Sequence, residues 1–202
     1  MDTKAKDPIV VVGAGIVGVC CALYLLRDGH RVMLLDRGAP GEGTSFGNGS
    51  IITEEAVVPV QTPGVALKVP GMLSDPLGPL AIRWSYLPKL APWLLQFIRA
   101  SSPERVEQVS IALARLLEGS LKAYDPLLEA AGIRDMVRRS GWVSVYETEA
   151  GFRGYEPMLE LQRRRGVNFE VLPAEELRQL EPSLAPIFHR GVFYPDVAHT
   201  VN

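Results

Sequence analysis

The sequence contains few of the residues that build disulfide frameworks and metal centres. Its 202 residues include two cysteines and three histidines. Cys20 and Cys21 are neighbours, and in a helix their side chains would point about 100° apart, which disfavours a bond between them. We therefore expect no disulfide framework and no metal site. Free thiols also favour a reducing compartment, so we expect a cytoplasmic location.

Neither an excess of one charge nor a long apolar run is present. Lys and Arg total 21, Asp and Glu total 23, and the net charge is -2, so nothing favours nucleic acid as a partner. The first eight residues are polar and show no export signal. A Leu-rich and Trp-rich stretch near 80–98 is interrupted by Arg83, Pro88, Lys89 and Pro92, so we expect no spanning helix. Peripheral contact with the surface of the inner membrane is an open alternative.

What the sequence does have is ordinary globular composition, 47% hydrophobic and 22% charged, and an informative N-terminus. Residues 9–12 are uniformly apolar and predict a strand that is buried in a parallel sheet. Residues 16–27 predict a helix that ends at Gly29, and residues 31–35 predict a second strand. This order is that of a βαβ unit.

The turn between the first strand and the helix carries a Gly-x-Gly-x-x-Gly motif, followed by an acid after the second strand. Gly13 permits the tight turn, Gly15 leaves room for a diphosphate, and Gly18 lets the helix pack close to the strand. Asp36 can accept hydrogen bonds from ribose hydroxyls and would repel the 2′-phosphate of NADP. The motif predicts a dinucleotide whose diphosphate lies at the helix N-terminus. The expected contacts are Val12, Gly13, Ala14, Gly15, Ile16, Val17, Gly18 and Asp36.

A loop rich in Gly, Ser, Thr and Asn follows at residues 38–50 and is longer than a simple connection needs. We expect further cofactor contacts from this region. The residues are Arg37, Thr44, Ser45, Asn48, Gly49 and Ser50. The alternatives are that the loop residues only form turns and that Arg37 is solvated.

After residue 50 the regular βαβ order is lost. Helices are expected near 65–73, from Ser102 and Pro103 through Leu121, at 151–165 and after Pro173. Strands are expected near 80–84, at 141–146, 168–172 and 191–194, the last of these ending the recognisable strands. The fold class is α/β, with an incomplete Rossmann-like βαβ start and a mixed α+β substrate domain. Residues 1–50 are expected to form the N-terminal part of the nucleotide-binding domain, and residues 51–195 part of the substrate domain. Residues 196–202 are expected to begin the return of the chain to the nucleotide-binding domain.

These residues also suggest a family. The run Gly13, Gly15, Gly18 and Asp36 resembles the FAD-binding start of the D-amino acid oxidase-like flavoproteins, and within them the bacterial D-amino acid dehydrogenases. Further segments are similar to that family and extend the resemblance over nearly the whole chain. They are the Thr-Ser-Phe-Gly-Asn-Gly-Ser loop at 44–50, residues 62–68, the strand 141–146, residues 174–182, and the final Phe-Tyr-Pro-Asp with His199 and Thr200.

The resemblance implies FAD as the cofactor and a D-amino acid or related amine as the substrate. The implied reaction takes a hydride from the α-carbon to the flavin N5, and water then releases a 2-oxo acid and ammonia. Electrons would pass to a respiratory acceptor, or to oxygen in oxidase relatives. The resemblance assigns no catalytic residue within this chain.

The chain is about half as long as members of that family. The third strand of the nucleotide sheet and the groups that hold the substrate carboxylate are therefore expected beyond Asn202. Two parallel strands do not make a stable sheet. We expect this chain alone neither to retain FAD nor to turn over substrate.

Two other functions remain open. An NAD-dependent dehydrogenase would need further regular βαβ units after Asp36, and the Pro-broken stretch after Ser50 argues against them. A catalytically silent remnant, made by a frameshift or a gene break, is the second alternative.

Overall fold

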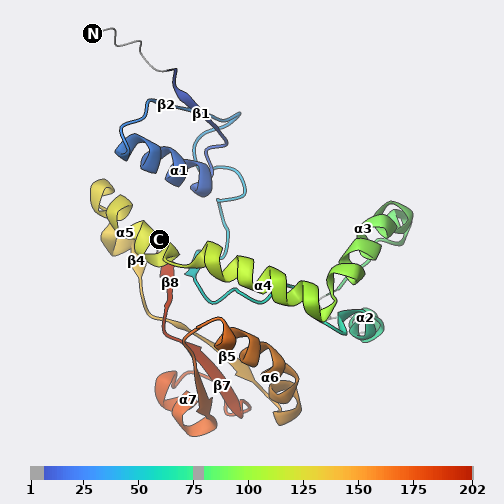
Figure 1. The fold of residues 1–202 in the computed structure, drawn as a ribbon. Coiled ribbons are helices and arrows are strands. Elements are labelled where there is room, and N and C mark those ends of the chain that lie inside the picture. The colour runs from blue at the N-terminus through green and yellow to red at the C-terminus, as the bar shows by residue number, and fades with distance from the viewer. Residues whose placement is uncertain (1–6, 75–79, 202) are drawn as a thin grey trace, which may run out of the picture. The chain divides into compact units, whose positions relative to one another are not determined.

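The structure, a computed structural model, describes residues 7–74 and 80–201, which form mixed helices and strands (Figure 1). The elements in chain order are β1 (Ile9–Val12), α1 (Ile16–Arg27), β2 (Val32–Leu35), β3 (Ile51–Thr53), α2 (Val65–Ser74), the 3-10 turn η1 (Trp84–Tyr86), α3 (Leu87–Ala100), α4 (Pro103–Leu117), α5 (Ser120–Ala131), the 3-10 turn η2 (Arg134–Met136), β4 (Val137–Arg138), β5 (Trp142–Tyr146), α6 (Glu149–Arg164), β6 (Glu170–Pro173), α7 (Ala174–Leu180), β7 (Arg190–Tyr194) and β8 (Val197–Thr200).

The chain divides into two compact units, each built from separate segments. Unit 1 comprises residues 1–52, 122–138 and 199–202, and unit 2 comprises 53–121 and 139–198. Unit 1 thus takes a helical segment from the middle of the chain. The domain bounds expected from the sequence stay a prediction.

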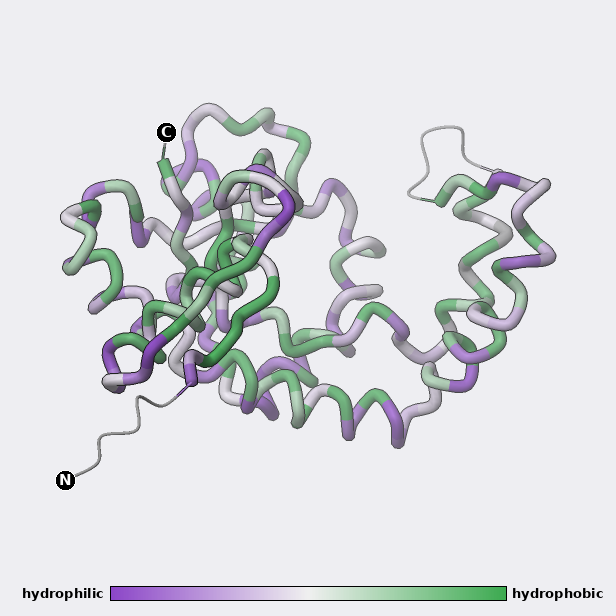
Figure 2. The backbone as a smooth tube through the Cα atoms, turned by 90° about the horizontal axis from the view of Figure 1, so that it is seen from above, coloured by the Kyte–Doolittle hydropathy of each residue, from purple (hydrophilic) through white to green (hydrophobic). Residues whose placement is uncertain are grey.

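Unit 1 is centred on the βαβ unit that the sequence predicts. β1 and β2 are parallel, with Ile9 opposite Val32 and Val12 opposite Leu35. Both strands are hydrophobic along their length (Figure 2). The helix α1 joins them and begins and ends at the predicted residues. The observed second strand begins one residue later than expected.

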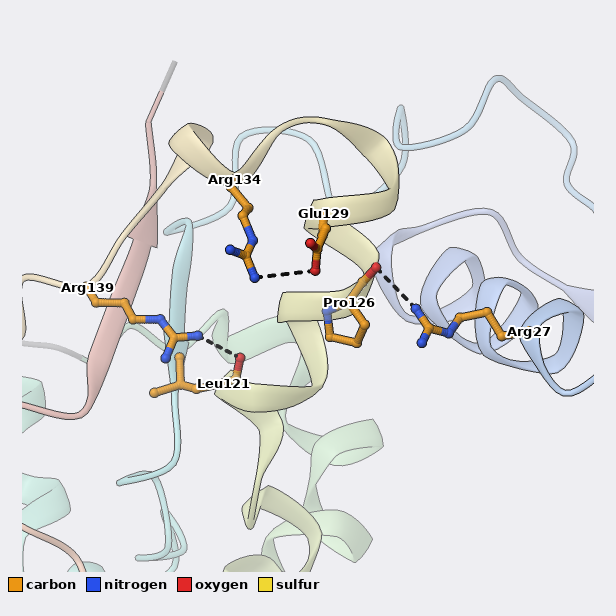
Figure 3. Close-up of polar contacts among 6 residues, drawn as sticks. All are labelled: Arg27, Leu121, Pro126, Glu129, Arg134 and Arg139. Atoms are coloured by element: carbon orange, nitrogen blue, oxygen red, sulfur yellow. Dashed lines mark hydrogen bonds and ion pairs between the residues drawn. The ribbon is translucent and has the colours of Figure 1, made fainter.

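Within unit 1, α5 is hydrogen-bonded to α1 through side chains at one end of α1. The Tyr24 hydroxyl donates to the Ala123 carbonyl at 2.7 Å, and Arg27 Nη1 donates to the Pro126 carbonyl at 3.2 Å (Figure 3). Arg27 lies in the last turn of α1, where a cation also interacts favourably with the helix dipole. These contacts connect two segments about a hundred residues apart in the sequence.

A small sheet combines short strands in the order β3, β8, β4. The pair β4 and β8 is antiparallel, with Arg138 opposite His199. The Thr200 N–H donates to the Ser50 carbonyl at 2.9 Å, and the Val201 N–H donates to the Met136 carbonyl at 2.8 Å. The last described residues are thereby hydrogen-bonded to segments from much earlier in the chain.

Unit 2 contains an antiparallel sheet in the order β5, β7, β6, with Trp142 opposite Tyr194 and Glu170 opposite Phe193. α6 packs against β5, and α7 packs against β6 and β7 (Figure 1). Burial of apolar side chains between helix and sheet is the main favourable contribution to folding here. The core cluster consists of Phe152, Leu159, Val192, Tyr194 and Val197.

Polar contacts fix the helices of unit 2. The Ser102 hydroxyl accepts from the Arg105 N–H at 3.3 Å and caps α4, as its position before Pro103 predicts. Arg165, after α6, donates to the buried Ser110 hydroxyl at 3.0 Å and forms an ion pair with Glu107. That ion pair lowers the pKa of Glu107.

Three expectations about elements after residue 50 are wrong. Residues 80–83 do not form a strand, and Trp84 instead begins the turn that leads into α3. The helix expected to run from Pro103 through Leu121 ends at Leu117, because Gly119 has a φ of +75° and separates α4 from α5. The recognisable strands do not end at Tyr194, since β8 follows.

Among the described residues, no helix is long and apolar enough to cross a membrane.

Candidate functional site

The glycine turn of unit 1 has the geometry of a nucleotide-binding turn. Gly13 has a φ of +105°, a conformation that glycine adopts without strain, and its N–H donates to the Leu35 carbonyl at 2.7 Å. A Cβ added to Gly18 would lie 1.8 Å from the Gly13 carbonyl oxygen. Only glycine fits at position 18, so the helix and the strand approach each other as closely as the motif predicts.

Ser45, in the predicted loop, contacts the start of α1. Gly15, the residue before the helix, has no side chain with which to cap it. The Ser45 hydroxyl accepts from the Ile16 N–H at 2.9 Å and lies 3.0 Å from where a Gly15 Cβ would be. Any side chain at position 15 would therefore crowd this hydroxyl.

Asp36 connects the end of β2 to the same turn. One carboxylate oxygen accepts from the Ala14 N–H at 2.6 Å, and the other accepts from the Gly38 N–H at 3.0 Å. These hydrogen bonds, the Ala14 bond first, hold the pKa of Asp36 below its usual value. The acid is therefore ionised at neutral pH and lies beside the backbone amides of the turn.

The structure brings together some of the residues expected to contact a cofactor and leaves others apart. Gly13 to Gly18, Asp36 and Ser45 form the contacts above, and the side chains of Val12 and Val17 are 83% and 74% exposed beside them. Arg37, Thr44 and Gly49 are exposed and do not take part in these side-chain hydrogen bonds. Asn48 accepts from the Ser50 N–H at 2.8 Å and so forms a local turn. The assignment of all these residues to cofactor binding stays a prediction.

Two glycines at this turn were not foreseen. The Gly38 N–H holds Asp36, and the Gly41 N–H donates to the Ala14 carbonyl at 2.8 Å. The richness of the loop in glycine was visible in the sequence. Backbone hydrogen bonds between distant segments leave no side-chain pattern, so nothing singled out these two positions.

The glycine turn and Asp36 together fit the diphosphate and one ribose of a dinucleotide. The turn carries no side chain at positions 13, 15 or 18, and α1 begins at its end with backbone amides available to an anion. The carboxylate of Asp36 lies within hydrogen-bond distance of the turn. A diphosphate at the glycines and a ribose at Asp36 match this arrangement of donors and acceptor.

Unit 2 contains two cavities that share Glu55. One, of about 350 Å³, is lined by Glu55, Arg165 and Tyr194 among others. The other, of about 360 Å³, is lined by Glu55 together with the aromatic side chains Trp142, Tyr146 and Tyr155. A carboxylate beside aromatic rings is a lining that suits an organic cation.

A buried hydrogen-bond chain connects Glu55 to the core. Gln162 Nε2 donates to a carboxylate oxygen of Glu55 at 3.2 Å, and the Tyr194 hydroxyl donates to Gln162 Oε1 at 3.0 Å. Gln162 and Tyr194 are each 1% exposed. Burial raises the pKa of Glu55 above its usual value, and the Gln162 bond offsets this only in part.

Comparison with known proteins identifies the family. The family model described as FAD dependent oxidoreductase, DAO, matches residues 8–202. The chain belongs to this family. Its cofactor is FAD, which agrees with the resemblance noted in the sequence and decides against the NAD alternative.

Individual proteins that are similar to this DAO chain agree with the family assignment. A D-amino-acid oxidase of Bradyrhizobium diazoefficiens is 41% identical over 187 residues, which cover 91% of this chain and 44% of that protein. L-proline dehydrogenase from P. horikoshii has a TM-score of 0.61 at 18% identity, and the match covers 96% of this chain and 38% of that one. Glycine oxidase from Bacillus cereus has a TM-score of 0.56 at 16% identity, covering 96% and 40%. This chain thus spans less than half the length of the relatives that it matches.

Proposed function

We propose that the protein oxidises the amine of a D-amino acid, or of a related amine, to a 2-oxo acid and ammonia. The observation that supports this substrate class is the 41% identity to a D-amino-acid oxidase across 91% of the chain. The chemistry that FAD supplies when bound is acceptance of the two electrons that leave the amine carbon. Water supplies the oxygen of the 2-oxo acid, and the nitrogen leaves as ammonia.

In this proposal the residues of unit 1 bind and orient the cofactor. The amides of Gly15, Val17 and Gly18, at the positive end of α1, hold the diphosphate, because those of Gly13, Ala14 and Ile16 donate to Leu35, Asp36 and Ser45. The Asp36 carboxylate, kept ionised by the Ala14 and Gly38 amides, accepts hydrogen bonds from the adenosine ribose. Ser45 fixes the first turn of α1 through the Ile16 amide, which keeps the amides in position.

The electron acceptor distinguishes a dehydrogenase from an oxidase. The resemblance to bacterial D-amino acid dehydrogenases supports a respiratory acceptor, and we propose this acceptor. The name of the 41% identical relative supports oxygen as the competing acceptor. Both can be measured on one preparation.

The test is an assay of the purified protein, expressed from its complete reading frame. D-amino acids, their L-enantiomers, glycine and sarcosine are supplied with an artificial electron acceptor under nitrogen, and separately with oxygen alone. The proposal expects ammonia and a 2-oxo acid from at least one D-amino acid. The rate should be higher with the artificial electron acceptor than with oxygen alone. A protein that holds flavin but acts on none of these amines would refute the substrate class and favour a silent remnant.

A matched pair of glycine variants tests the site itself. Gly18→Ala places a Cβ against the Gly13 carbonyl, so we expect loss of flavin absorbance and at least a tenfold loss of activity. Gly154→Ala, in α6 with nothing within 4 Å, is the control and should retain both. Retention of full flavin content by Gly18→Ala would contradict the proposed cofactor site.

A further inference from the structure

The segment formed by η1 and α3 exposes an unusual number of large apolar side chains. Five large apolar side chains of this segment are exposed; Trp93 and Leu95, for example, are 56% and 58% exposed. No residue of α3 is buried. Lys89, Gln96 and Arg99 are the strongly polar residues of α3, and its other positions carry apolar side chains or proline. We call this surface the α3 face. It consists of Trp84, Tyr86, Trp93, Leu95 and Ile98.

The charges on the same segment are all positive. Residues 80–103 contain Arg83, Lys89 and Arg99 and no acidic residue. All three cations are exposed, and none forms an ion pair with any residue that the structure describes. The rest of the chain has the opposite balance, since the net charge of the whole is -2. The α3 face therefore presents a local positive charge on an acidic protein.

This combination of residues has a specific physical use. Trp and Tyr side chains are favoured where an apolar phase meets water, because the ring is apolar and one edge is polar. Arg and Lys can bury their aliphatic stems and keep their charges in water. A helix with exposed aromatic and aliphatic side chains beside cations suits the boundary between lipid headgroups and acyl chains.

We propose that the α3 face binds the surface of an anionic phospholipid bilayer. The helix lies in the plane of the headgroups, because its 14 residues are too few to span the bilayer. The apolar side chains enter the boundary with the acyl chains, and Arg83, Lys89 and Arg99 contact lipid phosphates. This inference does not depend on the reaction that the protein catalyses.

The experiment measures binding of the protein, expressed from its complete reading frame, to phosphatidylcholine vesicles with and without phosphatidylglycerol. We expect cosedimentation with the anionic vesicles that weakens as salt is raised. The triple variant Arg83→Gln, Lys89→Gln, Arg99→Gln should bind about a hundredfold more weakly, at about fivefold per cation. Arg178→Gln, another exposed cation of unit 2, is the control and should bind as the parent does.

A second set of variants tests the apolar contribution. Trp93→Ser, Leu95→Ser and Ile98→Ser together should abolish sedimentation, whereas Leu180→Ser with Ile187→Ser, at exposed positions elsewhere in unit 2, should not. Circular dichroism checks that each variant is folded. Brominated lipids provide a readout without these substitutions, because they should quench fluorescence from Trp84 and Trp93 and leave Trp142 unaffected.

Three outcomes would overturn the proposal. Equal binding to neutral and anionic vesicles would show that charge plays no part. No binding to either would show that the face is covered by other residues of the protein. Concentration-dependent dimers that are lost in the Trp93, Leu95 and Ile98 variant, without vesicle binding, would assign the face to a second copy of the chain.

Discussion

At the scale of single residues, Glu55 combines burial with a position on two cavities. Its carboxylate accepts from Gln162, which in turn accepts from Tyr194, yet no cation among the described residues forms an ion pair with it. Burial therefore dominates and raises its pKa. A carboxyl group with a raised pKa in the folded state stabilises the fold below its unfolded pKa, and this contribution is lost as the pH rises through the folded pKa.

The substitution Glu55→Gln removes the titration and keeps an oxygen that can accept from Gln162. We expect the variant to have a higher Tm than the parent at pH 7 and the same Tm at pH 4, because only the ionised parent carries the desolvation penalty. Thermal unfolding followed by circular dichroism at both pH values measures this. Glu156→Gln, exposed on α6, should leave the parent's pH dependence unchanged. Equal Tm differences for Glu55→Gln at pH 4 and pH 7 would contradict the assignment.

The residues of the glycine turn were predictable from the sequence, and the Glu55 chain was not. Gly13, Gly15 and Gly18 have roles fixed by local geometry, so their spacing alone predicts them. Glu55 and Gln162 are joined across 107 positions of sequence. Such a contact depends on how unit 2 packs, and one sequence carries no local sign of it.

At the scale of elements, the N-terminus of α4 shows how a local signal is realised. Ser102 caps the helix, Pro103 occupies its first position, and Glu104 adds an acid to the first turn. Ser102→Ala removes the acceptor for the Arg105 amide and should lower the free energy of unfolding by about 1 kcal/mol. Urea denaturation measures the loss.

The matched variant Ser102→Asp retains an acceptor at the same position. It should restore most of the stability that Ser102→Ala loses. If both variants were equally destabilised, the hydroxyl would stabilise the protein by some means other than capping.

The elements that the sequence did not predict are those whose local signals conflict. α3 contains Pro92 in its interior, and a proline there removes one backbone hydrogen bond, so the sequence favoured an interruption. β8 is a short strand of four residues that is defined by pairing with β3 and β4, which are distant in sequence. By contrast, α1 has a glycine turn before it and Gly29 after it, and its bounds were predicted correctly.

At the scale of the whole molecule, unit 1 presents a nucleotide half-site on a sheet of two strands. Apolar side chains of both strands remain exposed, including Val10 and Leu35. A sheet of this size is marginal without further strands or helices to cover it. We therefore expect residues 1–202, purified alone, not to retain FAD through gel filtration. A yellow protein whose flavin absorbance coelutes with the chain would contradict this expectation.

The segmented construction of unit 1 has a consequence for synthesis. The Ser50 carbonyl accepts a hydrogen bond from the Thr200 amide, so the small sheet cannot close until residue 200 has left the ribosome. At roughly 5–20 residues per second, β3 remains without that contact for on the order of ten seconds or more after its own synthesis. During this interval β3 lacks its partner strand β8, so its backbone is open to nonnative pairing. Translation speed and chaperone supply should therefore influence how much of this protein a cell recovers in active form.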